Sequence, residues 1–276
     1  MNTRRKVLKS GGGLSTFRKP FRKKATAMPF TRPRHGLRWL IGAIVVLVVL
    51  GLGGPFLYIH FFNGSTPTAL SLSPASGATS ASSSPGSTVP ASTAASGSVA
   101  GTWSAGTGSV VGYRVNEVLF GQNATAVGRT TSVTGHLTIV GSTATAASFS
   151  VPMATVHSDK SQRDGQFDGR IMDVSQYPTG TFALTSPIDL APLPDTGAVR
   201  SYTAHGKLTL HGTTRAVTFT LTAERTAAKN GGAQIEVVGH IPVLFSDYNI
   251  ANPSFGGVVT TQDNGLLEFL LVFSKT

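Results

Sequence analysis

Strict alternation of apolar and polar residues is the feature that most restricts the fold of this chain. In the stretch RAVTFTLTAE, Val217, Phe219 and Leu221 alternate with three threonines. Alternation with a period of two places each set of side chains on its own face of a β-strand. About eight such segments follow one another from Thr102 onward, separated by turn sequences such as KNGG and QDNG. We therefore predict an all-β barrel or sandwich.

One segment, residues 162–175, departs from this pattern. Phe167, Ile171 and Val174 are four and three residues apart, which is the spacing of one helical face. Pro178 then predicts the end of the helix. We expect a short amphipathic helix in a long connection between two strands.

The positive charge of the chain is confined to its N-terminus. The whole chain has 23 Lys and Arg, 12 Asp and Glu, and a net charge of +11. Residues 1–38 contain 12 of the basic residues and no acidic one, so the rest has 11 basic and 12 acidic residues, a net charge of −1. A nucleic-acid-binding domain carries its basic patch on the folded part, so we predict no nucleic-acid partner. The absence of Cys excludes disulfides and thiolate chemistry.

An uncharged apolar segment follows the basic tail. Residues 39–62 contain no Lys, Arg, Asp or Glu, and 24 residues are enough for a helix to cross a hydrocarbon core of about 30 Å. We predict a single transmembrane signal-anchor helix, and a cleaved signal peptide is the alternative. Because the basic residues precede this segment, we expect a disordered tail over residues 1–38 in the cytoplasm and the C-terminal domain outside it.

Residues 63–101 consist mostly of Ser, Thr, Ala, Gly and Pro. This composition forms no core and is typical of a flexible linker. A random chain of these 39 residues has an end-to-end distance of roughly 35 Å. Residues 102–276 would then be a folded domain tethered to the outer side of the cell membrane.

The candidate metal-ligating and catalytic residues of the domain have simpler interpretations. His205 and His211 are six residues apart, about 20 Å on an extended strand, so they cannot bind one metal ion together. Asp164 and Asp168 could supply a pair of catalytic carboxylates, but neighbouring arginines such as Arg163 explain them as paired charges on a helix. We predict no metal site, no catalytic residue and no enzymatic activity.

The apolar faces of the strands would meet inside a closed sheet. The principal residues that we expect there are Phe149, Val151, Phe182, Leu184, Leu208, Leu210, Phe219, Leu221, Val243, Phe245, Phe269 and Leu271. An eight-stranded barrel can be filled by its side chains or can hold one small apolar ligand. The alternation alone leaves both alternatives open.

The order of several motifs gives a family resemblance. The stretch GTWSAGTGSVVGYRVNEVLFG is followed by Arg163-Asp164, by Tyr177-Pro178 with Thr181-Phe182, and by GKLTLHG starting at Gly206. Over residues 102–276 this arrangement resembles the YceI-like family of lipid-binding domains. The resemblance implies an extended, lipocalin-like, eight-stranded antiparallel barrel that holds a polyisoprenoid chain, as in prenyl quinones or prenyl phosphates.

The resemblance also suggests a role for the helical segment. It would cap one end of the barrel, with Phe167, Ile171 and Val174 turned inward and its charged residues turned to water. Arg163 and Asp164 would pair or cap locally, and the alternative is that they meet a polar headgroup. Many family members have a His after the first strand, where this chain has Asn116-Glu117.

We therefore expect a membrane-anchored, extracytoplasmic binding protein in the cell envelope. Its partners would be an isoprenoid lipid in the barrel and the membrane through residues 39–62, and it would need no catalytic cofactor. One alternative is a non-enzymatic interaction or structural module whose barrel is filled with side chains. An enzyme acting on an isoprenoid is the other.

Overall fold

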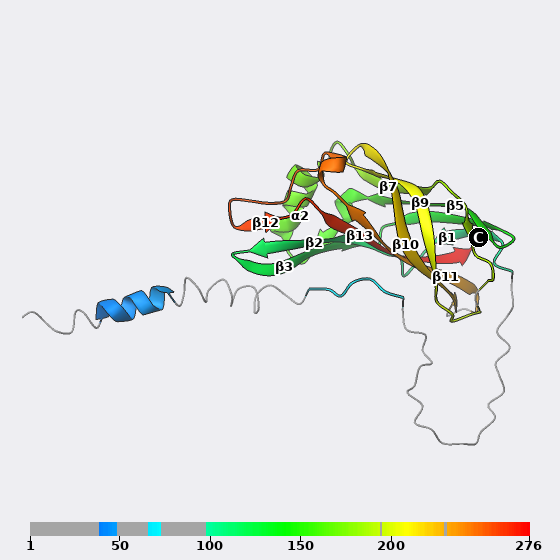
Figure 1. Ribbon diagram of the computed structural model, residues 1–276, viewed down its shortest axis with the longest axis horizontal. Helices are drawn as coiled ribbons and strands as arrows, with labels where there is room; N and C mark the ends of the chain where they lie inside the picture. The colour runs from blue at the N-terminus through cyan, green and yellow to red at the C-terminus, as the bar shows by residue number, and fades with distance from the viewer. Residues whose placement is uncertain (1–38, 49–65, 73–97, 194, 229–230) are drawn as a thin grey trace, which may run out of the picture. The chain divides into compact units, whose positions relative to one another are not determined.

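The computed structural model describes residues 39–48, 66–72, 98–193, 195–228 and 231–276 (Figure 1). The chain divides into two compact units, Met1–Val48 and Val49–Thr276. In the first unit, residues 39–48 form an exposed helix. No helix in the described part of the chain has both the length and the hydropathy needed to cross a membrane.

Several predictions fall on other parts of the chain. The tail of residues 1–38 and residues 49–62 of the predicted span lie outside the described residues. So do residues 63–65 and 73–97 of the predicted linker.

Eight strands of the second unit close into a barrel (Figure 1). Around the ring their order is β1-β4-β5-β7-β9-β10-β11-β13, and β13 pairs back with β1. The strands are β1 (Gly101–Ala105), β4 (Thr134–Val140), β5 (Thr143–Pro152), β7 (Thr179–Leu184), β9 (Arg200–Leu210), β10 (Thr213–Ala227), β11 (Ala233–Val243) and β13 (Gly265–Lys275). Each neighbouring pair is antiparallel. The predicted eight-stranded antiparallel barrel is confirmed.

A hairpin of β2 (Val110–Leu119) and β3 (Gln122–Thr130) extends the barrel at one end. β13 pairs with β2 through its first half, where Leu266 faces Arg114, and with β1 through its last residues, where Phe273 faces Ala105. Three short strands add to the edges. They are β12 (Val259–Thr261) beside β2, β6 (His157–Ser158) beside β3, and β8 (Ile188–Asp189) beside β5. In Figure 1 the hairpin and β12 lie together at the end of the barrel away from the C-terminus.

The burial of alternate residues explains the register of these strands. On β9, Ala204, Gly206, Leu208 and Leu210 are buried, and the residues between them are exposed or half-buried. A shift in pairing by one residue would turn both leucines toward water. Each buried leucine contributes about 1.5–3 kcal/mol relative to exposure, so the alternation selects one register.

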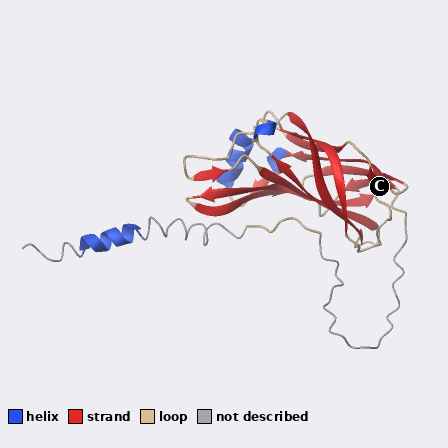
Figure 2. Ribbon diagram, in the orientation of Figure 1, coloured by secondary structure: helices blue, strands red, loops and turns tan. Residues whose placement is uncertain are grey.

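The connection from β5 to β7 is largely helical (Figure 2). Its elements are the 3-10 turn η2 (Met153–Thr155), the helix α2 (Ser161–Gln166) and the π-helical turn η3 (Phe167–Ile171). The predicted short helix is therefore confirmed, but it ends at Ile171 rather than near Pro178. Asp173 has a left-handed backbone with a φ of 40°. Its carbonyl accepts a hydrogen bond from the Gln176 N–H, which closes a separate turn after the helix. A further 3-10 turn, η4 (Ser246–Tyr248), follows β11.

Four phenylalanines form the centre of the core. Phe149 on β5, Phe182 on β7, Phe219 on β10 and Phe269 on β13 are all buried. Their ring centroids lie 5.4 Å apart for Phe149–Phe182, 5.3 Å for Phe149–Phe269, 5.5 Å for Phe182–Phe219 and 5.9 Å for Phe219–Phe269. These separations are typical of favourable aromatic pairs. This phenylalanine cluster connects strands on different sides of the barrel through its interior.

Candidate ligand cavity

A cavity of about 820 Å³ lies inside the barrel at the end where the β2–β3 hairpin projects. Its wall includes residues of β2, β3, β5, β7, β9, β11, β13 and the helical turns α2 and η3. Sites for small ligands have volumes of about 300–1,000 Å³, so this cavity is large enough for one. The predicted lumen residues that line it are Phe149, Val151, Phe167, Ile171, Leu208, Leu210, Val243 and Phe245.

The other predicted lumen residues lie at the opposite end. Phe182, Leu184, Phe219, Leu221, Phe269 and Leu271 line a second cavity of about 100 Å³. Phe149 lines both cavities, so the phenylalanine cluster forms the wall between them. The sequence left a hollow and a filled barrel as alternatives, and the structure has a larger cavity at the hairpin end and a smaller one at the opposite end.

Tyr113 on β2 is a cavity residue that the sequence analysis did not select. Its ring stacks on Phe167 with centroids 5.2 Å apart and an interplanar angle of 16°. Burial raises the pKa of Tyr113 to about 12, so its hydroxyl stays protonated at neutral pH and can donate a hydrogen bond. A signal was present, because Val111, Tyr113 and Val115 alternate in VVGYRV.

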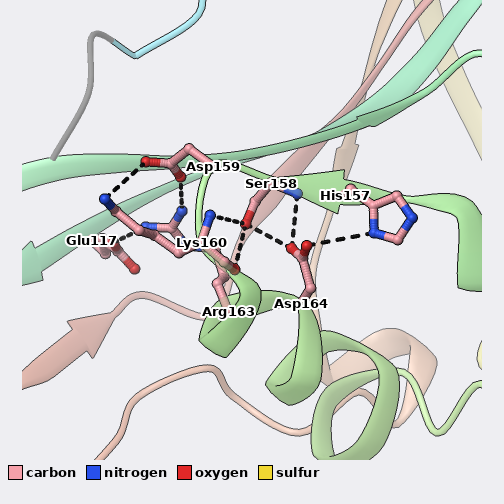
Figure 3. A network of polar contacts seen from close by, with 7 residues as sticks. All are labelled: Glu117, His157, Ser158, Asp159, Lys160, Arg163 and Asp164. Atoms are coloured by element: carbon pink, nitrogen blue, oxygen red, sulfur yellow. Dashed lines mark hydrogen bonds and ion pairs between the residues drawn. The ribbon is translucent and has the colours of Figure 1, made fainter.

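A polar cluster lies beside the cavity where α2 approaches β2 (Figure 3). Arg163 lies between two carboxylates: it forms an ion pair with Asp159, and its Nη2 is 3.6 Å from Oε1 of Glu117. Burial raises the pKa of Glu117, and the Arg163 guanidinium opposes this shift less strongly. Both Glu117 and Arg163 line the cavity, which places one carboxylate and one guanidinium on its wall.

Asp164 fixes the beginning of the helix. Its Oδ1 accepts hydrogen bonds from the backbone N–H of Ser158 at 2.8 Å and from the Ser158 hydroxyl at 2.7 Å (Figure 3). Nδ1 of His157 lies 3.4 Å from its other carboxylate oxygen. These contacts agree with the expectation that Arg163 and Asp164 pair or cap locally.

The remaining candidates for chemistry also have local contacts. Nδ1 of His205 lies 2.9 Å from the Thr218 hydroxyl, and the His211 ring packs against Tyr177 with centroids 4.3 Å apart. Within the described ranges, no three His, Asp or Glu side chains are grouped as metal ligands. Asp168 differs, since its buried Oδ1 has no hydrogen-bond partner among the described residues.

The sequence of this barrel matches a known domain model. The model is that of the YceI-like domain, and the match covers residues 104–273. This chain belongs to the YceI-like domain family. No curated protein matches the sequence.

Solved structures are similar over the YceI-like barrel. The polyisoprenoid binding domain from Saccharophagus degradans is 17% identical with a TM-score of 0.51, over 64% of this chain and 99% of that one. BcnA from Burkholderia cenocepacia is 23% identical with a TM-score of 0.41, over 58% of this chain and 95% of that one. The Campylobacter jejuni YceI protein is 14% identical with a TM-score of 0.45, over 54% and 84%. The first likeness supports the barrel fold.

The motif GKLTLHG of this YceI-like domain has a structural role. A Cβ built on Gly206 would lie 2.2 Å from Cε2 of Phe182, so the glycine makes room for the ring. His211 and Gly212, with φ of 48° and 70°, form the turn between β9 and β10. Tyr177 covers Gly212, where a Cβ would lie 2.5 Å from its ring. The motif therefore specifies a hairpin and the contacts of two aromatic rings.

Proposed function

We propose that this chain is a membrane-anchored, extracytoplasmic protein that holds an isoprenoid-type lipid in its barrel for transport or storage. The observation that carries the proposal is the cavity of about 820 Å³ inside a YceI-like barrel. A similar solved structure is described as a polyisoprenoid binding domain. Residues 39–62 supply the proposed anchor, since they lack charged residues.

The selectivity of such a site depends on more than apolar burial. Each CH₂ removed from water contributes about 0.8 kcal/mol, but a bilayer offers a lipid most of the same gain. Transfer from the membrane into the barrel therefore depends on the cavity's shape and on contacts to the headgroup.

The polar residues on the wall favour an uncharged headgroup, such as that of a prenyl quinone. Arg163 is already paired with two carboxylates, and Nζ of Lys160, another cation on the wall, lies 4.0 Å from Oδ2 of Asp159. Arg170 donates hydrogen bonds to the carbonyls of Asn252 at 3.0 Å and Pro253 at 3.2 Å. A phosphate headgroup would have to compete with these partners, whereas the neutral Tyr113 hydroxyl can donate to a quinone carbonyl. A prenyl phosphate is the alternative ligand.

The competing proposal is an interaction module that binds no lipid. The packed phenylalanine cluster favours it for one end of the barrel, because that end leaves only about 100 Å³ open. A substitution that fills the larger cavity would leave the activity of such a module unchanged.

Photochemical cross-linking distinguishes the two proposals. The full-length chain in membranes is irradiated with a diazirine-bearing isoprenoid, and the modified peptides are identified by mass spectrometry. We expect adducts on β2, β5 and η3. Ala126→Phe places a ring in the larger cavity and should reduce them about tenfold, which corresponds to about 1.4 kcal/mol of binding.

Ala146→Phe is the matched control, because Ala146 is exposed on β5. It should leave the adducts unchanged, and the melting temperatures of both variants show whether they remain folded. Adducts confined to residues 39–62, or equal in both variants, would contradict lipid binding in the cavity.

A further inference from the structure

A short piece of the predicted linker is attached to the barrel. Residues 66–72, here called the strap, lie along the β2–β3 hairpin. The carbonyl of Pro67 accepts a hydrogen bond from Nη2 of Arg114 at 2.8 Å, and the carbonyl of Thr68 accepts one from Nη2 of Arg129. Leu70 and Leu72 of the strap are half-buried.

Both arginines are held in place by a buried carboxylate. The side chain of Glu268 on β13 has no exposed surface, and it accepts from Nε of Arg114 at 3.2 Å and from Nε of Arg129 at 2.9 Å. Nη2 of Arg129 lies 2.7 Å from the same carboxylate. Each guanidinium thus binds both Glu268 and a carbonyl of the strap. Charge-assisted hydrogen bonds of this kind are strong, so the strap meets a rigid docking site.

The strap begins nearer the tip of the hairpin than it continues. Arg114 lies nearer the tip than Arg129, because Arg129 pairs with Gly112 across the hairpin. The chain therefore moves away from the tip between Pro67 and Thr68. Figure 1 shows the strap along the hairpin in this sense.

The attachment shortens the tether to the proposed anchor. Residues 63–65 alone connect the segment 39–62 to the strap. At about 3.6 Å per extended residue, Phe62 and Pro67 are at most roughly 18 Å apart. The hairpin tip lies six residues beyond Arg114, about 20 Å along the strand. A chain that leaves the membrane after Phe62 thus keeps Pro67 within roughly 18 Å of the membrane surface, a distance that the hairpin from Arg114 to its tip can span.

The surface at that tip is apolar. Phe120 and Val118 on the hairpin are 48% and 38% exposed, and Phe255 in the loop before β12 is 61% exposed. The two segments are joined, since the N–H of Phe120 donates to the Val258 carbonyl at 2.9 Å. Phe120 and Phe255 also line the larger cavity, so they form part of its rim. Residues 118–124 and 249–262 contain no Asp, Glu, Lys or Arg.

Phe120 occupies a position that disfavours an aromatic residue. Its φ is 49° and that of Gly121 is 76°, in the two-residue turn between β2 and β3. Such turns prefer Asn-Gly or Asp-Gly, and a bulky residue in left-handed backbone is strained. The exposed ring is therefore retained at the expense of stability. Aromatic side chains favour the interface between membrane and water.

We infer that the apolar rim formed by Val118, Phe120 and Phe255 rests on the outer surface of the lipid bilayer. The strap holds it there, and the larger cavity opens toward the membrane, so a lipid enters the barrel without crossing water. This inference rests on the proposed anchor of residues 39–62.

The absence of Cys in the chain permits a direct test. The full-length chain is reconstituted in vesicles of phosphatidylcholine and phosphatidylglycerol, with a fluorophore on Gln122→Cys at the tip or on Thr145→Cys at the opposite end. Lipids bearing nitroxide groups on their acyl chains should quench the tip label severalfold more strongly. Equal quenching at both positions, or no quenching at the tip, would overturn the inference.

Variants of the rim and of the tether test separately whether the apolar residues and the strap hold the tip at the membrane. Phe120→Asn suits the turn, so it should fold while quenching at the tip falls severalfold. Val140→Asn, an exposed apolar position at the end of β4, should have no effect. A Gly/Ser insertion of about ten residues after residue 65 should also reduce quenching, and the same insertion after residue 85 should not. If both insertions change the quenching equally, the strap does not set the distance between the hairpin tip and the membrane.

The outcomes also distinguish this inference from the proposed function. Chains that do not float with the vesicles would refute the anchor. Chains that float and form cavity adducts, but show no quenching at the tip, would refute the membrane-facing rim alone. Energy transfer between labelled chains that replaces the quenching would assign the rim to a second copy of the chain.

Discussion

At the residue scale, glycines opposite aromatic rings are a repeated feature of this barrel. A Cβ at Gly206 would lie 2.2 Å from the Phe182 ring, and one at Gly239 would lie 2.3 Å from the Phe269 ring. Both rings belong to the phenylalanine cluster. The missing side chains let these rings cover the neighbouring backbone, which compensates for the weakness of glycine in strands.

We predict that Gly206→Ala destabilises the barrel by about 1–3 kcal/mol, because the added methyl group overpacks the core. Urea unfolding of the two proteins measures the difference. Gly165→Ala on α2 is the control, since a Cβ there meets nothing within 4 Å and alanine favours a helix by about 1 kcal/mol. Equal stability of Gly206→Ala and the parent would show that the Phe182 ring moves freely.

The sequence identified some individual positions and missed others. Leu208 and Leu210 follow a clear alternation, and both line the larger cavity. Glu117 was noted only as a departure from the family, because its partner Arg163 lies on a distant helix. A pattern within one strand carries no information about which side chain faces it from another element.

At the element scale, the β2–β3 hairpin depends on one buried carboxylate. Glu268 interrupts the apolar run LLEFLL on β13, where it forms ion pairs with Arg114 and Arg129. We predict that Glu268→Gln lowers the free energy of unfolding by about 3 kcal/mol, because it leaves two guanidinium groups without their carboxylate. Amide hydrogen exchange should rise most in β2 and β3.

Glu236→Gln is the control for this variant. Glu236 is half-buried on β11 and accepts a hydrogen bond from Thr226 at 3.4 Å. We expect a change below about 1 kcal/mol, because the amide oxygen still accepts from Thr226 and the removal of one like charge across from Glu224 has a small effect. If Glu268→Gln also changes the free energy of unfolding by less than about 1 kcal/mol, the negative charge of Glu268 is not what holds the two arginines in place.

The elements show why part of the fold was predictable. Strand segments could be assigned because their burial is periodic, and the helix was located by the spacing of Phe167, Ile171 and Val174. The strap could not be assigned, because TPTALSL resembles the rest of the linker in composition. It is fixed by arginines 47 and 61 positions away in the sequence, and no local pattern records such contacts.

At the scale of the whole molecule, the barrel is divided by its phenylalanine cluster. The larger cavity and the strap lie toward the hairpin end, and the smaller cavity lies beyond Phe149. The apolar alternation is the same along both halves, so the sequence did not reveal which end is hollow. The difference arises from side-chain size, since four rings meet at one level of the barrel.

This division predicts a limit to the length of the bound lipid. Phe149→Ala removes the wall shared by the two cavities, so the barrel should retain longer isoprenoids than the parent does. Competition between isoprenoids of graded chain length and the photoreactive isoprenoid measures the limit.

The substitution Phe149→Ala should cost about 3–5 kcal/mol of stability, and Phe149→Leu provides a milder variant with a smaller shift in the same direction. Phe245→Ala enlarges only the larger cavity and should leave the limit unchanged. If Phe245→Ala and Phe149→Ala extend it equally, cavity volume rather than the phenylalanine wall determines the length.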